Sequence, residues 1–399
     1  MNGTADLDGI TRTPGASPGH LLALIRSAPA WTRQQLLDAT GMSRPTLLER
    51  MSPLFAAGLA REAGTTASVG GRPAQLISFD DRHLAVLTFD VGHTQGRVSL
   101  TGVHGRELRS SRCQLDITGT PPDQVLRRLT ALAGKLTADR TGDRIIGIGV
   151  GLPGPITPAT GLPGPTPIMP GWDAYPVVDR LREHWDVPMV LENDARAVVF
   201  GEATLHGGET LLGIKWATGI GAGLIADGRS IAGDDGAAGD IGHIKLTTSG
   251  PACRCGRRGC LAAYASGHAL LGQLADHGVT HLDDLVRRAG ERDIGRRLDD
   301  AARKVGTVLA SLIAMANPRT LVLGGTIGAL PRVLDAVSTR VREVALDRST
   351  NELRIVTSSL GERAGTVGLV HLVVSRVLAP DAVDQTLADR HGLFGLPVS

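Results

Sequence analysis

Four side chains that commonly bind metals are concentrated in residues 236–260: His243, Cys253, Cys255 and Cys260. Three of the chain's four cysteines fall there within eight residues. Thiolates spaced this closely, in a chain otherwise poor in cysteine, favour metal coordination over disulfides. One nitrogen and three sulfurs fill a tetrahedral zinc ion and leave no position for an activated water, so we expect a structural Zn²⁺ site. The alternative is a cluster of reduced, buried cysteines without a metal.

The composition is that of a globular protein. The 399 residues are 42% hydrophobic and 21% charged, enough for two or three domains with apolar cores. The net charge is only +2, so nucleic-acid binding would need a local basic patch. The N-terminus lacks an apolar signal segment, and apolar runs such as residues 305–316 are too short to span a bilayer. We therefore expect a cytoplasmic protein with no membrane partner.

The first eighty residues have the pattern of a helix-turn-helix. Residues 17–28 form an expected helix, and a capping box at residues 32–35 opens a second helix. Gly41 breaks that helix, and Ser43 is a suitable N-cap for a third. The start of the last helix would face the major groove of DNA. The expected contacts to bases and phosphates from this helix are Ser43, Arg44, Thr46 and Arg50.

A β-hairpin wing is expected to follow, with its tip in residues 64–73. Glycines there let the backbone approach DNA, and Arg72 ahead of a proline suits insertion into a narrow minor groove. The competing interpretation is a small helical module that binds protein only, since residues 1–83 carry eight arginines against seven carboxylates. The wing favours DNA binding.

The rest of the chain repeats one order of elements twice. Strands 84–90 and 96–103 flank a tight turn, and strands 211–217 and 222–226 flank a second one. Each pair is followed by alternating helices and strands, which predicts two α/β lobes with a cleft between them. This is the two-lobed architecture of the actin-like ATPase and sugar kinase group. Cys113 lies on an expected strand of the first lobe as a small buried hydrophobe.

These expectations divide the chain into five parts. The expected parts are a flexible N-terminus over 1–16, a winged helix-turn-helix over 17–80, a first lobe over 84–205, a second lobe with the zinc loop over 206–380 and a C-terminal tail over 381–399. An alternative for the last helices of the second lobe is that they pack against the first lobe.

Six sequence motifs in order make the chain resemble the ROK family of repressors, open reading frames and kinases, from about residue 17 to about residue 380. The motifs are GGRP at 70–73, LPGPITPATG at 152–161, PGWDAYP at 170–176, ENDARA at 192–197, GDIGH at 239–243 and CRCGRRGCLAAYASG at 253–267. Kinases of the family mostly lack the N-terminal DNA-binding domain, whereas its repressors carry it.

The resemblance gives roles to one residue pair in particular. Asp194 matches the family's catalytic base, which would accept the proton of the attacking hydroxyl if kinase activity were kept. Asn193 matches a ligand of a sugar hydroxyl. An Asn-Asp pair that opens a helix is otherwise simply a cap. We expect both residues to face the ligand cleft.

The phosphate-binding turns implied by the resemblance are only partly intact. The first turn corresponds to residues 90–94, where His93 replaces a glycine and would crowd a nucleotide. In the second turn Ala217 replaces another glycine. The expected phosphate-turn residues are Asp90, Gly92, Thr94, Thr218, Gly219 and Gly221. The changes argue against ATP and Mg²⁺ as cofactors.

The sugar side implied by the resemblance has also changed. Asp240 and Ala262 stand where family members have two glutamates, and Ile168 where many have an asparagine. A lost carboxylate removes charge-assisted hydrogen bonds worth about 1.5–3 kcal/mol each. His243 in the family also touches the sugar, so the expected ligand set is Asn193, Asp194, Asp240 and His243. The changes point to a less polar ligand than a simple hexose, or to none.

Together these features predict a DNA-binding transcriptional regulator, most simply a repressor, with a degenerate sugar kinase domain that senses an effector and dimerises. The expected partners are operator DNA, a small molecule such as a sugar or sugar derivative, and further copies of the chain in a homodimer or homotetramer. The alternative is an ATP-dependent sugar kinase that also binds DNA. A scaffold without any ligand is a third interpretation.

Overall fold

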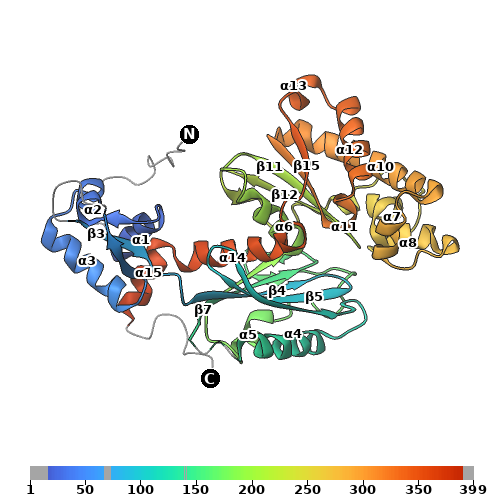
Figure 1. Ribbon diagram of the computed structural model, residues 1–399. Helices are drawn as coiled ribbons and strands as arrows, with labels where there is room; N and C mark the ends of the chain where they lie inside the picture. The colour runs from blue at the N-terminus through green and yellow to red at the C-terminus, as the bar shows by residue number, and fades with distance from the viewer. Residues whose placement is uncertain (1–16, 67–72, 139, 141, 390–399) are drawn as a thin grey trace.

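The computed structural model describes residues 17–66, 73–138, 140 and 142–389 (Figure 1). The small N-terminal domain lies at one end, and two larger α/β lobes follow. The expected fold class is confirmed.

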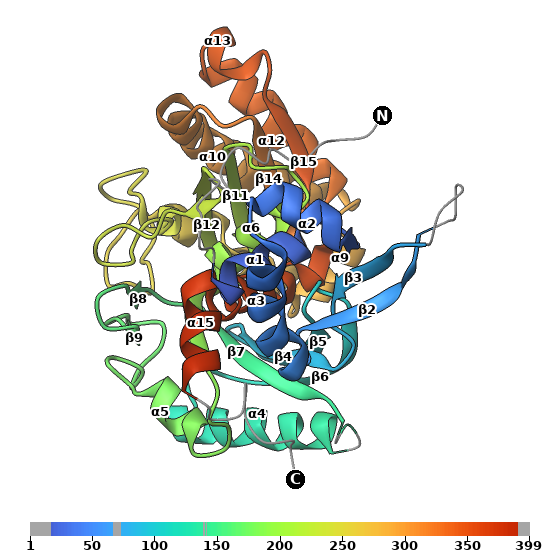
Figure 2. The ribbon, with the colours of Figure 1, turned by 90° about the vertical axis from the view of Figure 1, so that its left-hand side faces the viewer.

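The N-terminal domain has three helices and a small sheet, as expected for a winged helix. Its helices are α1 (Pro18–Arg26), α2 (Arg33–Thr40) and α3 (Arg44–Ala56). Its strands β1 (Trp31–Thr32), β2 (Ala60–Thr65) and β3 (Gln75–Phe79) pair in the order β1-β3-β2. Strands β2 and β3 project as the wing (Figure 2), whose tip with Arg72 lies outside the described residues.

Local signals account for the helix boundaries in this domain. Thr32 and Gln35 form the capping box, with both reciprocal hydrogen bonds present. Gly41 ends α2 in the left-handed conformation at φ 69°, which a residue with a side chain adopts only at a steric cost. The Ser43 hydroxyl accepts from the Thr46 amide at 3.3 Å and caps α3. The turn between the two helices is therefore fixed by the sequence.

The first lobe is a five-stranded sheet with helices on both faces. Its strands are β4 (Leu84–Val91), β5 (Gln95–Gly102), β6 (Glu107–Gln114), β7 (Arg144–Leu152) and β10 (Met189–Asn193), in the order β10-β7-β4-β5-β6. Helices α4 (Pro122–Thr137) and α5 (Val177–Arg182) cover one face, and α14 (Ala364–Val377) covers the other (Figure 1). A small hairpin of β8 (Ile156–Thr157) and β9 (Leu162–Pro163) follows β7.

The second lobe has a similar sheet in the order β13-β12-β11-β14-β15. Its strands are β11 (Leu211–Trp216), β12 (Ile220–Ala226), β13 (Arg229–Ser230), β14 (Thr320–Gly324) and β15 (Arg354–Thr357). Its helices are α7 (Leu261–Ala265), α8 (Gly267–Gln273), α9 (Leu282–Arg287), α10 (Arg292–Ala316), α11 (Gly325–Gly328), α12 (Pro331–Val344) and α13 (Asp347–Thr350). Short 3₁₀ turns lie at Ile241–His243, Ala275–His277 and Gly361–Arg363.

Helix α6 (Asp194–Ala203) connects the two lobes. It packs against β11 and β12 of the second sheet, where Val199 fills the space above Gly213 and Gly223. Its other side contacts α14 so closely that a Cβ atom on Gly368 would lie 1.9 Å from the Ala197 carbonyl oxygen. The glycines at this crossing allow two helices to meet backbone to backbone, which holds the lobes together at the base of the cleft.

The end of the chain packs on the N-terminal domain. The segment expected as a tail begins with helix α15 (Pro380–Ala388), which lies against α1 (Figure 1). The Gly19 amide donates to Asp384 Oδ1 at 2.7 Å, and Arg26 donates to the Leu378 carbonyl at 3.3 Å. One hydrophobic core runs from α1 and α3 through α14 to β4 and β7. The N-terminal domain is thus packed directly against the first lobe.

Among the described residues, no single helix is long and apolar enough to cross a membrane. One pair of helices bent by 58°, Gly361–Val377 and Pro380–Ala388, passes the test of length and composition together.

Candidate functional site

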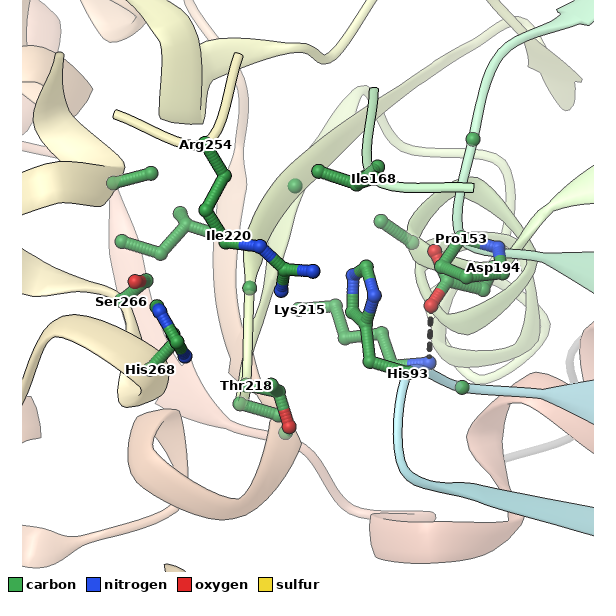
Figure 3. A pocket seen from close by; sticks show the side chains of 18 of the residues that line it. His93, Pro153, Ile168, Asp194, Lys215, Thr218, Ile220, Arg254, Ser266 and His268 are labelled. Carbon is green, nitrogen blue, oxygen red and sulfur yellow. Dashed lines mark hydrogen bonds and ion pairs between the residues drawn. The ribbon is translucent and has the colours of Figure 1, made fainter. Parts of the chain in front are cut away.

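A cavity of about 1030 Å³ opens between the two lobes (Figure 3). Both sheets contribute to it, through the turn after β4, the start of α6, the turn between β11 and β12 and the loop that carries the cysteines. Every residue expected at the ligand site or the phosphate turns lines this one cavity: Asp90, Gly92, Thr94, Asn193, Asp194, Thr218, Gly219, Gly221, Asp240 and His243. Residues more than a hundred positions apart are therefore brought together.

Asp194 is placed at the base of the cavity by the start of α6. Asn193 caps this helix, since its Oδ1 atom accepts from the amides of Ala195 at 3.0 Å and Arg196 at 3.1 Å. Its Nδ2 atom donates to the Gly154 carbonyl at 3.0 Å. The side chain of Asn193 thus has the capping role, and it also lines the cavity. Asp194 is 9% exposed.

Lys215, on β11, is the cation that faces Asp194. Its Nζ atom lies 2.7 Å from Asp194 Oδ2, with 21% and 12% of the two side chains exposed (Figure 3). The ion pair joins the second lobe to the first. Burial lowers the pKa of Lys215, but the charges of Asp194 and Asp90 and the hydrogen bond outweigh it and raise the pKa above its usual value. Lys215 is therefore charged at neutral pH.

Asp90 is the second carboxylate at this point. It is the last residue but one of β4 and pairs with Gly151 of β7. A Cβ atom on Gly151 would lie 3.7 Å from Asp90 Oδ1 and 3.8 Å from the Asp194 Cα. Burial raises the pKa of Asp90, Lys215 opposes that change, and Asp194 adds to it. The two carboxylates are close enough for each to act on the other's charge.

A role for Lys215 was not expected from the sequence. A signal for it was present, because a lysine interrupts the otherwise apolar run LLGIKW of β11, and the chain has only four lysines. An isolated lysine within a buried strand needs a partner of opposite charge. Its partner could not be identified locally because Asp194 lies in the other lobe.

His93 fills the first phosphate turn. Its Nδ1 atom is buried without a hydrogen-bond partner, and its Nε2 atom would lie 3.5 Å from a Cβ atom on Gly219 in the second turn. Burial lowers the pKa of His93 to about 4, the charge of Asp194 opposing that change only in part. The imidazole is therefore neutral near pH 7, and it occupies the space between the two turns.

Gly221 has a packing role in the second turn. A Cβ atom there would lie 2.7 Å from the Ala195 side chain at the start of α6. The turn glycine is needed for helix packing whether or not a phosphate binds.

The sugar side of the cavity contains few acidic groups. Asp240 is exposed, and it lines the cavity together with Ala262 and Ile168. The loop before Asp240 is held by the buried Arg196, which donates to the Gly236 carbonyl at 2.6 Å. Arg196 itself forms an ion pair with Glu192 at 2.7 Å. This pair was not expected from the sequence, and it holds the loop that leads to Asp240.

Three nitrogen-containing side chains, Arg254, His268 and His93, line the cavity. Figure 3 shows Arg254 and His268 on one side and His93 on the other. Arg254 donates to the Thr118 hydroxyl at 2.8 Å and so reaches from the second lobe to the first. Burial and the charge of Arg254 lower the pKa of His268.

The four expected metal ligands form one cluster beside the cavity. The ligand atoms of His243, Cys253, Cys255 and Cys260 all lie within 4.8 Å of one another. Two of the separations are 3.7 Å, from Cys253 Sγ to His243 Nδ1 and from Cys255 Sγ to Cys260 Sγ. Sulfurs around a tetrahedral zinc ion with bonds of about 2.3 Å lie about 3.8 Å apart. The arrangement can hold a metal ion.

Burial affects the ionisation of the thiols in the metal cluster. Burial, with hydrogen bonding to Cys255, raises the pKa of the Cys260 thiol to about 12. A bound dication would stabilise the thiolate forms of these cysteines. Since His243 Nδ1 faces Cys253, a metal there would also fix the imidazole that lines the cavity.

At the N-terminal domain, α3 presents its first turn to solvent. Arg44 is exposed, and Thr46 and Arg50 are half-buried. The Ser43 and Thr46 hydroxyls lie 2.8 Å apart. Leu48, one turn after Arg44, is 52% exposed. An exposed apolar residue on this face was not expected from the sequence.

The family model described as the ROK family matches residues 86–376, which is well over half of the chain. The chain belongs to the ROK family. The xylose repressor of Bacillus spizizenii is 27% identical over a match that covers 90% of this chain and 94% of the repressor. The glucokinase of Thermotoga maritima is 28% identical, over 74% of this chain and 98% of the glucokinase.

The two ROK relatives differ in how far the match extends. Residues 84–399 make up about four fifths of the chain, so a match over 90% of it must include part of the winged helix. A solved structure of a ROK family transcriptional regulator, described as a homolog of the E. coli MLC protein, also matches the chain over nearly its whole length. That structure has a TM-score of 0.75 at 22% identity, covering 93% of this chain and 98% of the regulator.

Proposed function

We propose that this ROK protein is a transcriptional repressor, which binds operator DNA through its winged helix and responds to a small molecule in the cleft between its lobes. The observation that carries the proposal is the winged helix itself, in a chain similar to xylose repressors over most of its length. The kinase relatives match only about three quarters of the chain.

DNA contacts are assigned to the exposed face of α3. The N-terminus of a helix attracts phosphates, and Arg44 at the first position of α3 is free to reach a guanine edge or a phosphate. Ser43 and Thr46 would add hydroxyl contacts, and Leu48 offers an apolar surface to a thymine methyl group. Arg50 supports this surface from a half-buried position. Arg72 of the wing is proposed from its sequence context alone.

Selection of DNA fragments by the purified full-length protein tests this role. We expect enrichment of a palindrome whose half-sites lie about one helical turn apart, with affinity that falls steeply as salt rises. Equal binding to all fragments at physiological salt would contradict the assignment.

The effector is proposed to be a sugar or a sugar derivative. Asn193, Asp194, Asp240 and His243 bring amide, carboxylate and imidazole groups to one cavity, which suits hydroxyl recognition. Xylose is a first candidate because several relatives are named xylose repressors. Ala262 makes a weaker site for hexoses than a glutamate would.

The effector proposal is tested by thermal unfolding of the purified protein with sugars, amino sugars and sugar phosphates. A binding effector should raise the melting temperature and lower operator affinity, and Asp240→Asn should reduce both effects. If no compound changes operator affinity, the protein is a repressor without this sensing step.

We propose zinc as the metal held by His243, Cys253, Cys255 and Cys260, in a structural role. Three thiolates and one imidazole at these separations are the donors that Zn²⁺ prefers, and they leave no open position. The metal would fix the loop that carries His243 and Arg254 at the cavity.

A two-fold assembly is also proposed, as a homodimer or a homotetramer. Palindromic half-sites require two winged helices related by a two-fold axis. Analytical ultracentrifugation of the free and DNA-bound protein distinguishes these states, and a monomer bound to one half-site would contradict both.

Sugar phosphorylation is the second candidate function. It is favoured by Asp194, which faces the cavity, and by the similarity to glucokinase. Lys215, His93 and Ala262 oppose it. Measurement of ADP release over a sugar panel decides between the two functions, since turnover abolished by Asp194→Asn would establish a kinase.

A further inference from the structure

Lys215 lies near two acidic side chains, Asp90 and Asp194, at the base of the cavity. The Asp194 and Asp90 carboxylates come from the ends of two strands that flank β7. Lys215 reaches Asp194 from the opposite sheet, and its charge also acts on Asp90. Its Nζ atom is 2.7 Å from Asp194 Oδ2, and about four fifths of its side chain is buried. Taking two carboxylates out of water requires a compensating cation, which the ammonium group supplies.

Other basic groups near this point are already engaged. Arg97, which also lines the cavity, forms an ion pair with Glu107. Arg254 donates to Thr118 at the other side of the cavity. Lys215 is therefore the cation that both carboxylates share.

A metal–nucleotide complex does not fit this arrangement. A magnesium ion binds carboxylate and phosphate oxygens, and the Lys215 ammonium group already occupies Oδ2 of Asp194. Displacing the ammonium group would leave a buried positive charge beside the metal. The nearby His93 imidazole also fills the space next to Gly219, where a phosphate would have to approach the turn.

We propose that the Lys215 ammonium group is a built-in cation, which takes the place of a divalent metal between Asp90 and Asp194 and closes the cleft to metal–nucleotide complexes. Lys215 also joins the two lobes without a ligand, because it lies on β11 of the second sheet and Asp194 directly follows β10 of the first sheet. The inference goes beyond repression as such, since a repressor could also retain a nucleotide.

The test is the binding of Mn²⁺, as a probe for a divalent cation, to the full-length protein. Electron paramagnetic resonance counts free Mn²⁺ in the presence of wild type, Lys215→Met and Lys215→Arg. The exposed Lys135→Met is the matched control for loss of a lysine. The cysteine cluster is unchanged in all four proteins, so its contribution cancels.

Lys215→Met should gain one Mn²⁺ site at least about tenfold tighter than any site in wild type, because two carboxylates then lack a cation. Lys215→Arg and Lys135→Met should bind as wild type does. Adding Asp90→Asn to Lys215→Met should abolish the new site, and Mn²⁺ should raise the melting temperature of Lys215→Met alone. A Lys215→Met protein that binds no additional Mn²⁺ would overturn the proposal.

Wild type provides a second measurement that does not depend on the folding of a variant. ATP binding by wild type should be no stronger with Mg²⁺ than with EDTA. Mg²⁺-dependent binding of ATP that Asp90→Asn removes would refute the built-in cation. Operator binding by the same wild-type preparation is measured separately, so failure here is distinguishable from failure of the repressor function.

Discussion

Arg44 is the side chain on α3 that is best placed to contact DNA. Arg44→Ala should lower operator affinity about three- to thirtyfold, and it should reduce the slope of log affinity against log salt by about one if the contact is to a phosphate. Fluorescence anisotropy over a range of salt concentrations measures both quantities. Arg348→Ala, also at an exposed position, on α13 in the second lobe, should change neither. Equal losses in the two variants would refute the proposed interface.

The cysteine cluster predicts a protein that contains one metal ion per chain. Cys255→Ser removes one thiolate, so the purified variant should lose most of its zinc and melt several degrees lower. Elemental analysis by mass spectrometry and thermal unfolding measure the two effects. Cys113→Ser on β6 lies outside the cluster and should keep the zinc. Wild type without a stoichiometric metal would disprove the site.

His93 should make the protein sensitive to acid. Its pKa falls from 6.5 in the unfolded chain to about 4 in the fold, so the unfolded chain binds more protons between these values. The free energy of unfolding should therefore fall as the pH falls toward 4, with His93 contributing about 2 kcal/mol between pH 7 and pH 5. His93→Gln should remove the part of the decrease in unfolding free energy that comes from protonation of His93. Urea unfolding at the two pH values tests it, and an equal loss in both proteins would contradict the assignment.

At the residue scale, the sequence was informative where one segment carries the chemistry. His243 and the three cysteines are close in sequence, so their spacing alone indicated a metal site. The Asp194 pair with Lys215 and the contact of Arg196 with Gly236 depend on how the two sheets face one another. No local pattern contains that information.

At the level of the elements, the sequence predicted the helix boundaries that capping residues determine. It did not predict which helices pack closely against one another. Ser43, Thr32 and Gly41 act within one turn of the chain, so their effect is visible in the sequence. The packing of α15 on α1 joins residues more than 350 positions apart, and residues 381–399 were expected as a tail for that reason.

The contact between α1 and α15 gives a prediction for a matched pair of glycines. A Cβ atom on Gly19 would lie 2.0 Å from the Pro380 carbonyl oxygen, so Gly19→Ala should lower the free energy of unfolding by about 1–3 kcal/mol. Gly134 of α4 has open space around it, and Gly134→Ala should raise stability by up to about 1 kcal/mol. Urea unfolding measures both. A change of the same sign in both variants would indicate that α1 and α15 are not packed in this way.

For the whole molecule, α14 links the ligand cleft to the DNA-binding domain. Near its first residue, a Cβ atom on Gly365 would lie 2.5 Å from Asp90 Oδ2, and its far end shares a core with α1. A structural change at the cleft carboxylates can therefore be transmitted to the winged helix along α14, which is about twenty ångströms long. This continuity could not be predicted from the order of the elements.

Removal of residues 380–399 tests the docking of the winged helix. The truncated chain loses α15, so the N-terminal domain should unfold at a lower temperature than the lobes and become sensitive to limited proteolysis before residue 84. Removal of residues 390–399 alone keeps α15 and should leave the proteolysis pattern unchanged. Calorimetry that shows one unaltered transition in both truncations would refute this role of α15.

The apolar face of α14 also limits how such proteins can exchange their DNA specificity. Val370, Val373 and Val377 are buried in the core that the winged helix completes, and Leu84 and Val86 share it. A winged helix transplanted from a distant relative would not be complementary to this face of α14. The poor packing would leave apolar side chains exposed to solvent and favour aggregation. We therefore expect that substitutions on the outer side of α3 change the operator preference of this protein with less loss of stability than replacement of the whole winged helix.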